Sequence, residues 1–431
     1  MKRSYLLAFI LLIVATVAFA GGNRESASAA REDGPIVLTM LTGTSQPMEG
    51  LAAVIEAAEE RLNIRVEVER APAGTEHDNI VRTRLATGDM SDMMIYNVGS
   101  LFHALNPSQH FVDLSNEPFI ERLEDSFVQT VTSDGAIYGI PLTTTRVGGW
   151  LYNKRVYEEL GLTVPRTWDQ LIQNLDTIRQ NSDITPVIGA YRDSWTAQIV
   201  FLADNYNVMA ADPSFADEFT AGRAKFADHP AALRSWEKLA QVGTYLNSDF
   251  LATTHEMALE MLINGEGAHY PTITNALSVM FELYGDAVND IGVFGQPGDD
   301  PNNHGVTVWM PGGMFINRNG SNVEAAKRFF EFFISDDALA IYSSRLKPDG
   351  PYAIRGVGLP DDVYPGVQDL LPFFEAGRTA PALELITPVK GPNAPQLTVE
   401  AGAGIRSPRD AAAAYDRDVE QQAIQLNLPG W

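Results

Sequence analysis

Apolar and polar positions in the first part of the chain follow strand and helix spacings in turn. Residues 36–41 alternate and residues 64–68 form a second β-rich run, so both predict strands. Between them, Pro47 begins a stretch with apolar residues at a helical period that ends near residue 62. A helix at 80–86 and a strand at 93–97 repeat this order, which predicts βαβ units and a parallel sheet.

This predicted sheet indicates where a ligand would bind. Ligands of open α/β sheets lie beyond the carboxyl ends of the strands. The loops at 42–46 and 96–100 each follow one of the predicted strands. We therefore expect both loops to face the same crevice.

The rest of the chain is mainly helical in its pattern. Thr167 and Gln170 form a capping box, which predicts a helix start. Ser407 followed by Pro408 predicts the start of the last helix, with a cap and a proline in the first turn. Amphipathic stretches predict further helices at 230–242, 254–263 and 322–334.

The N-terminus reads as a signal peptide over residues 1–20. A basic pair, Lys2 and Arg3, precedes an apolar run of about 16 residues, shorter than the roughly 20 that a spanning helix needs. Ala18-Phe19-Ala20 is a cleavage site of the small-x-small type. Residues 21–35 are rich in Gly, Ser and Ala, which predicts a disordered leader. Gly21 stands where a lipoprotein needs Cys, so we expect a periplasmic protein without a lipid anchor.

Composition narrows the class of protein further. The chain contains no cysteine, so no disulfide is expected, and its 431 residues are enough for two lobes with their own cores. The net charge of −24 disfavours binding to nucleic acid or to anionic membranes.

The sequence carries no recognisable catalytic signature. His255-Glu256 is not followed by the second His of a zinc-protease motif, and Ser100 lacks the spacing of a nucleophile elbow. The acidic run at 299–303 lacks the terminal Glu of a calcium loop and is more typical of a solvated loop. We therefore expect no enzyme, no cofactor and no metal. A secreted glycoside hydrolase stays open as an alternative, because it needs only two well-placed carboxylates among 55 acidic residues.

Five segments in a fixed order resemble one known family. They are Leu85-Ala86-Thr87-Gly88-Asp89 with Asp92; Asp134-Gly135-Ala136-Ile137-Tyr138-Gly139-Ile140-Pro141; Leu151-Tyr152-Asn153-Lys154 followed by Gly161, Pro165 and Thr167-Trp168-Asp169; Asn264-Gly265-Glu266-Gly267-Ala268; and Gly312-Gly313 through Ala325-Ala326-Lys327-Arg328-Phe329. Together they resemble the family 1 extracellular solute-binding proteins, the sugar-binding group of ABC importers that includes maltose-binding protein. The likeness spans about residues 36–345, and the chain beyond Leu346 matches only loosely.

The resemblance implies a fold and a function. The fold is α/β and two-lobed, the type II periplasmic binding protein fold, with each lobe a sheet flanked by helices and a hinge between them. The N-terminal lobe would comprise 36–145 plus 306–349, and the C-terminal lobe 146–305 plus 350–431. The function implied is that of a monomeric receptor that closes on a mono- or oligosaccharide and delivers it to the permease of an ABC importer. A non-sugar solute, or presentation of the ligand to a membrane sensor, stays open.

Matching the family's motifs residue by residue predicts a ligand site. Arg146 falls where the family often places a carboxylate, and Asn275 falls near a stacking Trp of the family, so both are departures. For Arg146 and Arg192 the alternative is a salt bridge, and for the Trp residues it is burial in a core. The predicted contacts are Ser45, Gln46, Tyr96, Asn97, Arg146, Arg192, Asp193, Trp195, Tyr270, Asn275 and Trp309.

Overall fold

A computed structural model describes residues 34–431 of the chain. The predicted signal peptide at 1–20 and nearly all of the predicted leader at 21–35 lie outside the described residues. Pro35–Trp431 forms one unit with two larger sheets and a small two-stranded one, β4–β5.

The first sheet contains the predicted βαβ opening. Its strand order is β2-β1-β3-β11-β6, in which β1 is parallel to β2 and β3, and β11 is antiparallel to β3 and β6. The predicted strands and helices are confirmed, and each strand next to the first helix extends two or three residues further than its pattern indicated. The bounds are β1 Ile36–Gly43, α1 Glu49–Leu62, β2 Ile64–Ala71, α2 Thr75–Thr87, β3 Met93–Tyr96, β6 Gly139–Pro141 and β11 Gly313–Ile316.

The second sheet is built around one buried strand, β7. It has the order β12-β10-β7-β8, and β9 also pairs with β7. β7 is antiparallel to β8, β9 and β10, while β10 and β12 are parallel. All eight residues of β7 are buried. The bounds are β7 Arg146–Asn153, β8 His269–Ile273, β9 Ile291–Gly295, β10 Val306–Trp309 and β12 Thr379–Pro381.

The chain passes between the two sheets more than once. The first passage leads from β6 in the first sheet to β7 in the second. The passage of the chain back to the first sheet was expected before residue 306. However, β10 pairs with β7 and so belongs to the second sheet. The side chain of Thr307 holds β10 there, since it donates to the carbonyl of Ala203 at 2.6 Å and accepts from the amide of Tyr206 at 2.9 Å. The return therefore falls between Trp309 and Gly313.

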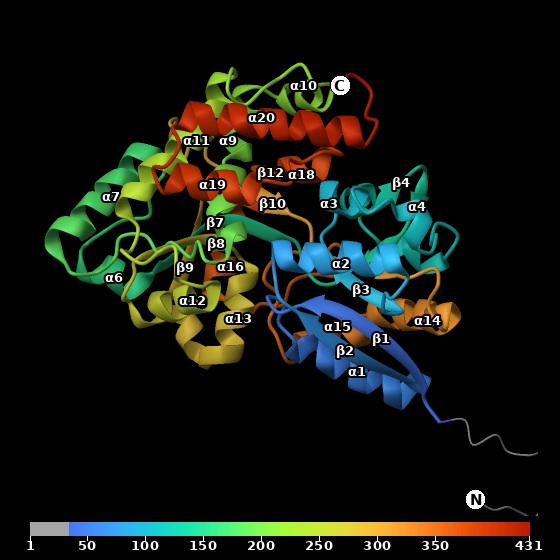
Figure 1. The fold of residues 1–431 in the computed structure, drawn as a ribbon. Coiled ribbons are helices and arrows are strands. Elements are labelled where there is room, and N and C mark those ends of the chain that lie inside the picture. The colour runs from blue at the N-terminus through green and yellow to red at the C-terminus, as the bar shows by residue number, and fades with distance from the viewer. Residues whose placement is uncertain (1–33) are drawn as a thin grey trace, which may run out of the picture. The chain divides into compact units, whose positions relative to one another are not determined.

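Helices that are far apart in sequence pack against one another in two groups. In Figure 1 the orange α14 and α15 lie beside the blue α1, and both contact α1. The red α19 and α20 lie beside α11 on the other part of the unit. The predicted caps are confirmed at Thr167 and Ser407, and the structure adds side-chain caps at Thr254 and Asn322.

The predicted helices appear with bounds close to their patterns: α7 Trp168–Asn181, α11 Pro230–Val242, α12 His255–Asn264, α14 Val323–Phe333 and α20 Pro408–Gln425. The remaining elements are α3 Ser100–His103, α4 Pro107–His110, η1 Pro118–Arg122, α5 Asp125–Thr130, β4 Thr132–Ser133, β5 Ala136–Ile137, α6 Lys154–Glu159, η2 Ser194–Gln198, α8 Ile199–Leu202, α9 Asn205–Ala211, α10 Phe215–Thr220, η3 Gly243–Tyr245, α13 Asn275–Tyr284, η4 Gly285–Asp290, α15 Asp336–Ser343, α16 Pro365–Gln368, α17 Leu371–Glu375, α18 Leu383–Ile386 and α19 Ala394–Gly402.

Candidate ligand-binding crevice

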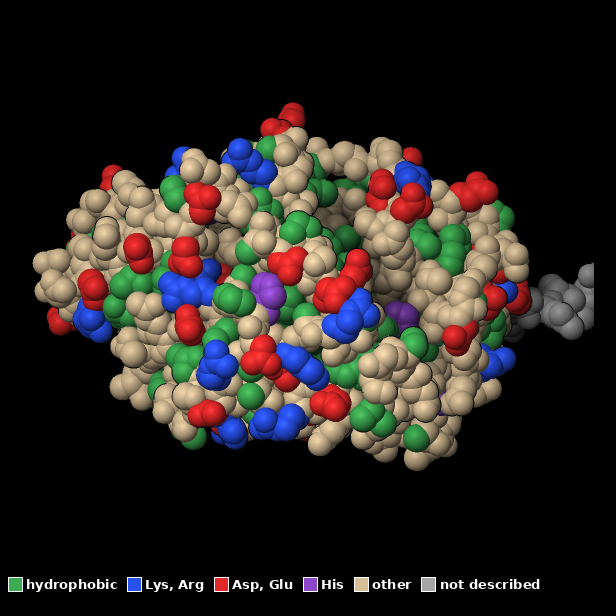
Figure 2. All heavy atoms as spheres, turned by 90° about the horizontal axis from the view of Figure 1, so that it is seen from above, with side chains coloured by type: hydrophobic (Ala, Val, Ile, Leu, Met, Phe, Trp, Pro, Cys, Tyr) green, Lys and Arg blue, Asp and Glu red, His purple; other side chains and the backbone are tan. Residues whose placement is uncertain are grey.

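Residues from the ends of strands in both sheets meet where the chain crosses between them. The loop after β1 carries Ser45 and Gln46, both half-buried, and Arg146 is the first residue of β7. The guanidinium of Arg146 lies 3.4 Å from Gln46 Oε1, so the two sheets contact each other here. A pocket beside Arg146 is lined from both sides, by Pro47, Thr143, Thr144, Ser278, Tyr342, Lys347, Pro348, Asp349 and Tyr352. We call the region between the two sheets the crevice; Figure 2 shows the surface hollowed near the middle of the molecule.

Arg146 forms a buried ion pair at this crossing. Its Nε lies 3.7 Å from Asp349 Oδ2, and both residues are less than 10% exposed, at 7% and 6%. Asp349 also accepts a hydrogen bond from the hydroxyl of Thr144. Burial raises the pKa of Asp349, and the positive charge of Arg146 opposes that rise. The salt bridge considered as the alternative for Arg146 is therefore present.

The first sheet contributes Tyr96 and Asn97 at the end of β3. Tyr96 is buried, and its hydroxyl donates to Asp78 at 2.8 Å, so it is fixed from within its own lobe. Its ring stacks on His77 with 5.9 Å between centroids. Burial raises the pKa of Tyr96, so its hydroxyl stays protonated. Asn97, the next residue, is exposed.

Trp195 of η2 packs against the other side of the crevice. A β-carbon on Gly74, the residue before α2, would lie 3.1 Å from Trp195 Cδ1, so the indole edge rests on the backbone of the first lobe. Trp195 is half-buried, and its ring lies 5.0 Å from that of His255. The predicted aromatic contact thus sits between elements of both sheets.

His255 organises the residues around Trp195. Its Nδ1 lies 2.7 Å from the hydroxyl of Tyr270, and its backbone amide donates to Asp193 at 2.7 Å. Tyr270 is only 1% exposed, so its hydroxyl is held inside the lobe by His255. Burial lowers the pKa of His255 to about 4, while the charge of Asp193 opposes that shift. Arg192, next to Asp193, is exposed.

Trp309 and Asn275 lie on the second-sheet side of the crossing. Trp309, the last residue of β10, is opposite Arg146 in the sheet, and its ring covers Gly148, where a β-carbon would lie 2.1 Å from it. Its indole donates to Glu384 Oε1 at 2.7 Å. Asn275 is buried at the first turn of α13.

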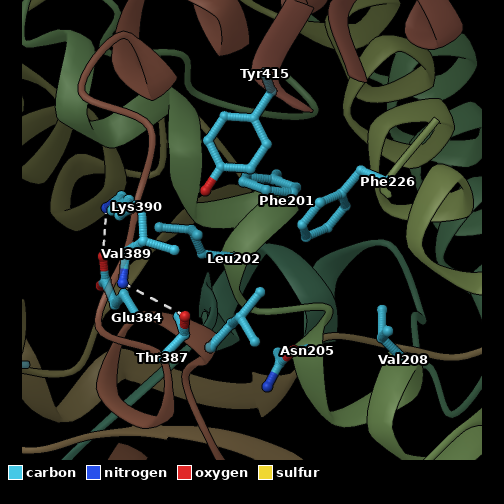
Figure 3. Close-up of a pocket in the computed structure, with 11 residues that line it drawn as sticks. Phe201, Leu202, Asn205, Val208, Phe226, Glu384, Thr387, Val389, Lys390 and Tyr415 are labelled. Atoms are coloured by element: carbon cyan, nitrogen blue, oxygen red, sulfur yellow. Dashed lines mark hydrogen bonds and ion pairs between the residues drawn. The ribbon is translucent and has the colours of Figure 1, made fainter. Parts of the chain in front are cut away.

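Glu384, which accepts the hydrogen bond from Trp309, also lines a separate pocket on the side of the second sheet. Its other oxygen forms an ion pair with Lys390, and both side chains are largely buried. Figure 3 shows this pair beside a mainly apolar lining that includes Phe201, Leu202, Phe226 and Tyr415. The Trp309 indole is therefore engaged by the protein rather than free in the crevice.

The structure brings most, but not all, of the predicted site residues together. Gln46, Arg146 and Trp309 surround the crossing. Asp193, Trp195 and Tyr270 form a second group around His255, in which Trp195 contacts Gly74 of the first lobe. Asn97 and Arg192 are exposed, without a described contact to either group. Sequence reasoning missed Asp349, His77 and His255. His255 was considered only as part of a zinc motif, and its position beside Trp195 depends on contacts distant in sequence.

The acidic loop at 299–303 has internal partners. Asp299 accepts two hydrogen bonds from Arg234 at 3.1 Å, and Asp300 accepts from the amide and side chain of Asn302. Between residues 34 and 431, no group of three or more His, Asp or Glu side chains is arranged to hold a metal ion. Within the same range, no helix combines the length and apolar character needed to cross a membrane.

Solved structures share this arrangement. A "Chitin oligosaccharide binding protein" superposes with a TM-score of 0.75 at 17% identity, covering 91% of this chain and 100% of that one. "SBP RafE in complex with raffinose" gives 0.72 at 20% identity, covering 90% and 99%. The fold is that of the two-lobed type II periplasmic binding proteins.

Sequence comparison adds the family. The family model described as "Bacterial extracellular solute-binding protein" matches residues 42–340, and the chain belongs to that family. The "Multiple sugar-binding protein" of Streptococcus mutans is 25% identical over 357 residues, covering 79% of this chain and 80% of its own. The "Melibiose/raffinose/stachyose-binding protein MelE" of Bacillus subtilis is 23% identical over 185 residues, covering 42% and 41%.

Proposed function

We propose that this protein is the solute-binding component of an ABC importer and that it binds a mono- or oligosaccharide in the crevice. Membership of the solute-binding family supports the receptor role. The names of the Streptococcus mutans and Bacillus subtilis relatives support a sugar as the solute. The observation that carries the proposal is Trp195, a half-buried indole set among polar groups, because sugars offer apolar C–H faces and a rim of hydroxyls.

The proposed role involves no chemistry. The crevice carboxylates nearest the predicted contacts already have structural partners: Asp349 pairs with Arg146, and Asp193 accepts the amide of His255. A glycoside hydrolase would need one acid and one base free to face the bond that is broken. Because Asp193 and Asp349 both have structural partners, they support ligand binding rather than glycoside hydrolysis.

The ligand contacts divide by the groups that each residue has free. Trp195 offers a ring for stacking, while Ser45, Gln46, Asn97, Arg146, Arg192, Asp193 and Asn275 offer polar groups to the hydroxyls. Tyr96, Tyr270 and Trp309 use their hydroxyl or indole groups on Asp78, His255 and Glu384. In the proposal these three aromatic residues form the walls and position their neighbours.

Binding would close two lobes about the crossing segments. We place the N-terminal lobe at about 36–145 plus 313–349 and the C-terminal lobe at about 146–309 plus 350–431, with the correction at β10 included. A ligand shifts the equilibrium only by binding the closed state more tightly than the open one. Contacts made by both lobes on one ligand supply that difference, and the permease would recognise the closed receptor.

The predicted signal peptide and the family support an exported, periplasmic receptor. We propose that it acts as a freely diffusing monomer, since both lobes must be free to dock on the permease. Size-exclusion chromatography with light scattering tests the monomer, and sequencing the N-terminus of the mature protein tests cleavage after Ala20.

A thermal-shift screen tests the ligand class. The panel should contain galactose, raffinose, stachyose, chito- and xylo-oligosaccharides, uronic acids and, as non-sugars, amino acids and polyamines. A ligand that binds only the native state stabilises it by RT ln(1 + [L]/Kd), which is about 2.7 kcal/mol at a hundredfold excess over Kd. We expect a neutral sugar to raise Tm and calorimetry to confirm it. Stabilisation by a non-sugar alone would overturn the sugar assignment and leave the receptor role.

A further inference from the structure

Several buried polar atoms on the elements that border the crevice make no hydrogen bond with the described residues 34–431. Across residues 34–431, the buried atoms without a partner include Thr42 Oγ1 and His77 Nδ1 from the first lobe and His255 Nε2 and Thr272 Oγ1 from the second. Arg146 Nε at the crossing belongs to the same set. Buried polar atoms are nearly always paired, so each of these exceptions calls for an explanation.

On the first-lobe wall, the exception is an imidazole. His77 lies in the first turn of α2 and is 7% exposed. Its Nδ1 would lie 3.8 Å from a β-carbon on Gly43, at the end of β1 and next to the predicted contact loop. A hydrogen bond with the backbone of Ile95 and the stacked ring of Tyr96 fix its orientation.

On the second-lobe wall, a second imidazole is fixed in the same manner. His255 is 9% exposed, and the Tyr270 hydroxyl holds its Nδ1 at 2.7 Å. Its Nε2 has no partner in the described chain, and neither has the hydroxyl of Thr272, two residues after Tyr270 on the same face of β8. Trp195 bridges the two walls, because it contacts His255 on one side and Gly74, at the start of the His77 helix, on the other.

We infer that His77 and His255 read the ligand from opposite lobes, each using its unpaired ring nitrogen on a hydroxyl of the bound sugar. The inference rests on the proposed function, because it requires the crevice to hold that ligand. Each imidazole is oriented by a partner at its other nitrogen or by stacking, so it is preorganised for one direction. Simultaneous contact with both rings requires the closed arrangement, which ties recognition to closure.

The same geometry favours a neutral ligand. Burial lowers the pKa of both His77 and His255, so both rings are neutral at pH 7. A neutral imidazole donates or accepts one hydrogen bond, as a hydroxyl requires, and supplies no charge for a carboxylate or phosphate. The buried cation at the crossing, Arg146, is already opposed by Asp349.

Alanine variants with a matched control test the inference. His77→Ala and His255→Ala should each weaken the binding of the tightest neutral sugar in the panel about tenfold or more, measured by calorimetry. His304→Ala is the control, because His304 is also buried with an Nδ1 that lacks a partner in the described chain, but it packs on Phe373 outside the crevice. Its affinity should stay within about twofold of wild type.

Deoxy analogues of the same sugar distinguish a direct hydrogen bond from His255 to the ligand from a purely structural role of His255. Wild type should lose affinity for the analogue that lacks the hydroxyl facing His255, and His255→Ala should bind that analogue and the parent sugar equally. If His255→Ala does not fold, Tyr270→Phe and His255→Gln replace it in the same comparison. Two results overturn the inference and leave the proposed function intact. One is near-wild-type sugar affinity in both histidine variants, once both are shown to be folded. The other is that these variants still bind every deoxy analogue more weakly than the parent sugar, as wild type does. Failure of wild type to bind any sugar overturns the sugar assignment of the proposed function instead.

Discussion

Arg146 and Asp349 form a buried pair that joins the start of β7 to the segment after α15. Their closest atoms are 3.7 Å apart, and each residue is less than a tenth exposed. Removing one partner of a buried pair leaves the other charge uncompensated, which typically costs about 3–5 kcal/mol. The pair therefore fixes the crossing between the two sheets at the edge of the proposed site.

We expect Arg146→Met to lower the free energy of unfolding by about 3 kcal/mol or more, because Asp349 would remain buried without its cation. Urea denaturation of the unliganded protein measures this change. The double variant Arg146→Met with Asp349→Leu should recover much of the loss, since it removes both charges. Equal stability of the single variant and wild type would mean that the two charges are independently solvated.

Glu282 of α13 caps a helix of the other lobe. One of its oxygens accepts the backbone amides of Met48 and Glu49, both at 2.7 Å, at the N-terminus of α1. A carboxylate at a helix N-terminus contributes about 0.3–1 kcal/mol. Because α1 and α13 lie in different lobes, this contact joins the two lobes, and we expect it to favour closure.

Glu282→Gln should therefore weaken sugar binding by about two- to fivefold, by making closure less favourable. Small-angle scattering of the unliganded protein should show a larger radius of gyration than wild type. Glu331→Gln, an exposed change on α14, serves as the control. A variant at position 282 with unchanged affinity and unchanged scattering would show that the contact does not influence closure.

Local patterns predicted the elements well, because each depends on neighbours in sequence. The capping box at Thr167 and the helix at 230–242 were predicted with their bounds. The return crossing was misplaced, because Val306–Trp309 is a strand whose partner β7 lies far upstream, and its pattern carries no sign of which sheet it joins.

The site was harder to predict than the fold for the same reason. Asp349 and His255 act through Arg146 and Tyr270, and the Arg146–Asp349 pairing is distant in sequence. Tyr270 was chosen as a ligand contact from its position after a family motif, but only the packing of β8 against α12 determines that its hydroxyl faces His255. Motifs locate the crevice; burial decides which side chains have groups free within it.

Trp195 provides a direct test of stacking. Trp195→Ala should weaken sugar binding by about tenfold or more, because it removes the ring against which an apolar sugar face would pack, and Trp195→Phe should retain part of the affinity. Trp431→Ala is the control, since Trp431 packs near α10 and donates to Thr220 at 2.8 Å. Affinity in Trp195→Ala equal to that of the control would exclude stacking at this position.

Two buried histidines predict acid sensitivity of the fold. Burial lowers the pKa of His255 and of His269 to about 4, from an ordinary value of 6.5. His269 bonds to the Tyr157 hydroxyl at 2.6 Å and the Pro186 carbonyl at 2.7 Å. Between pH 6.5 and 4 the unfolded chain binds protons at these rings that the folded chain does not bind. Stability must therefore fall as the pH falls through that window, by up to about 3 kcal/mol for each ring.

His269→Gln isolates one of these contributions, because glutamine does not titrate. At pH 7 the variant should be less stable than wild type, since it loses the fitted hydrogen bonds on both ring nitrogens. The gap should narrow as the pH falls from 6.5 to 4.5, because only wild type loses the contribution of a neutral ring. Urea denaturation at half-unit pH steps measures the difference in free energy of unfolding between wild type and His269→Gln. A difference that stays constant across this range would show that His269 has the same pKa in the folded and unfolded chain.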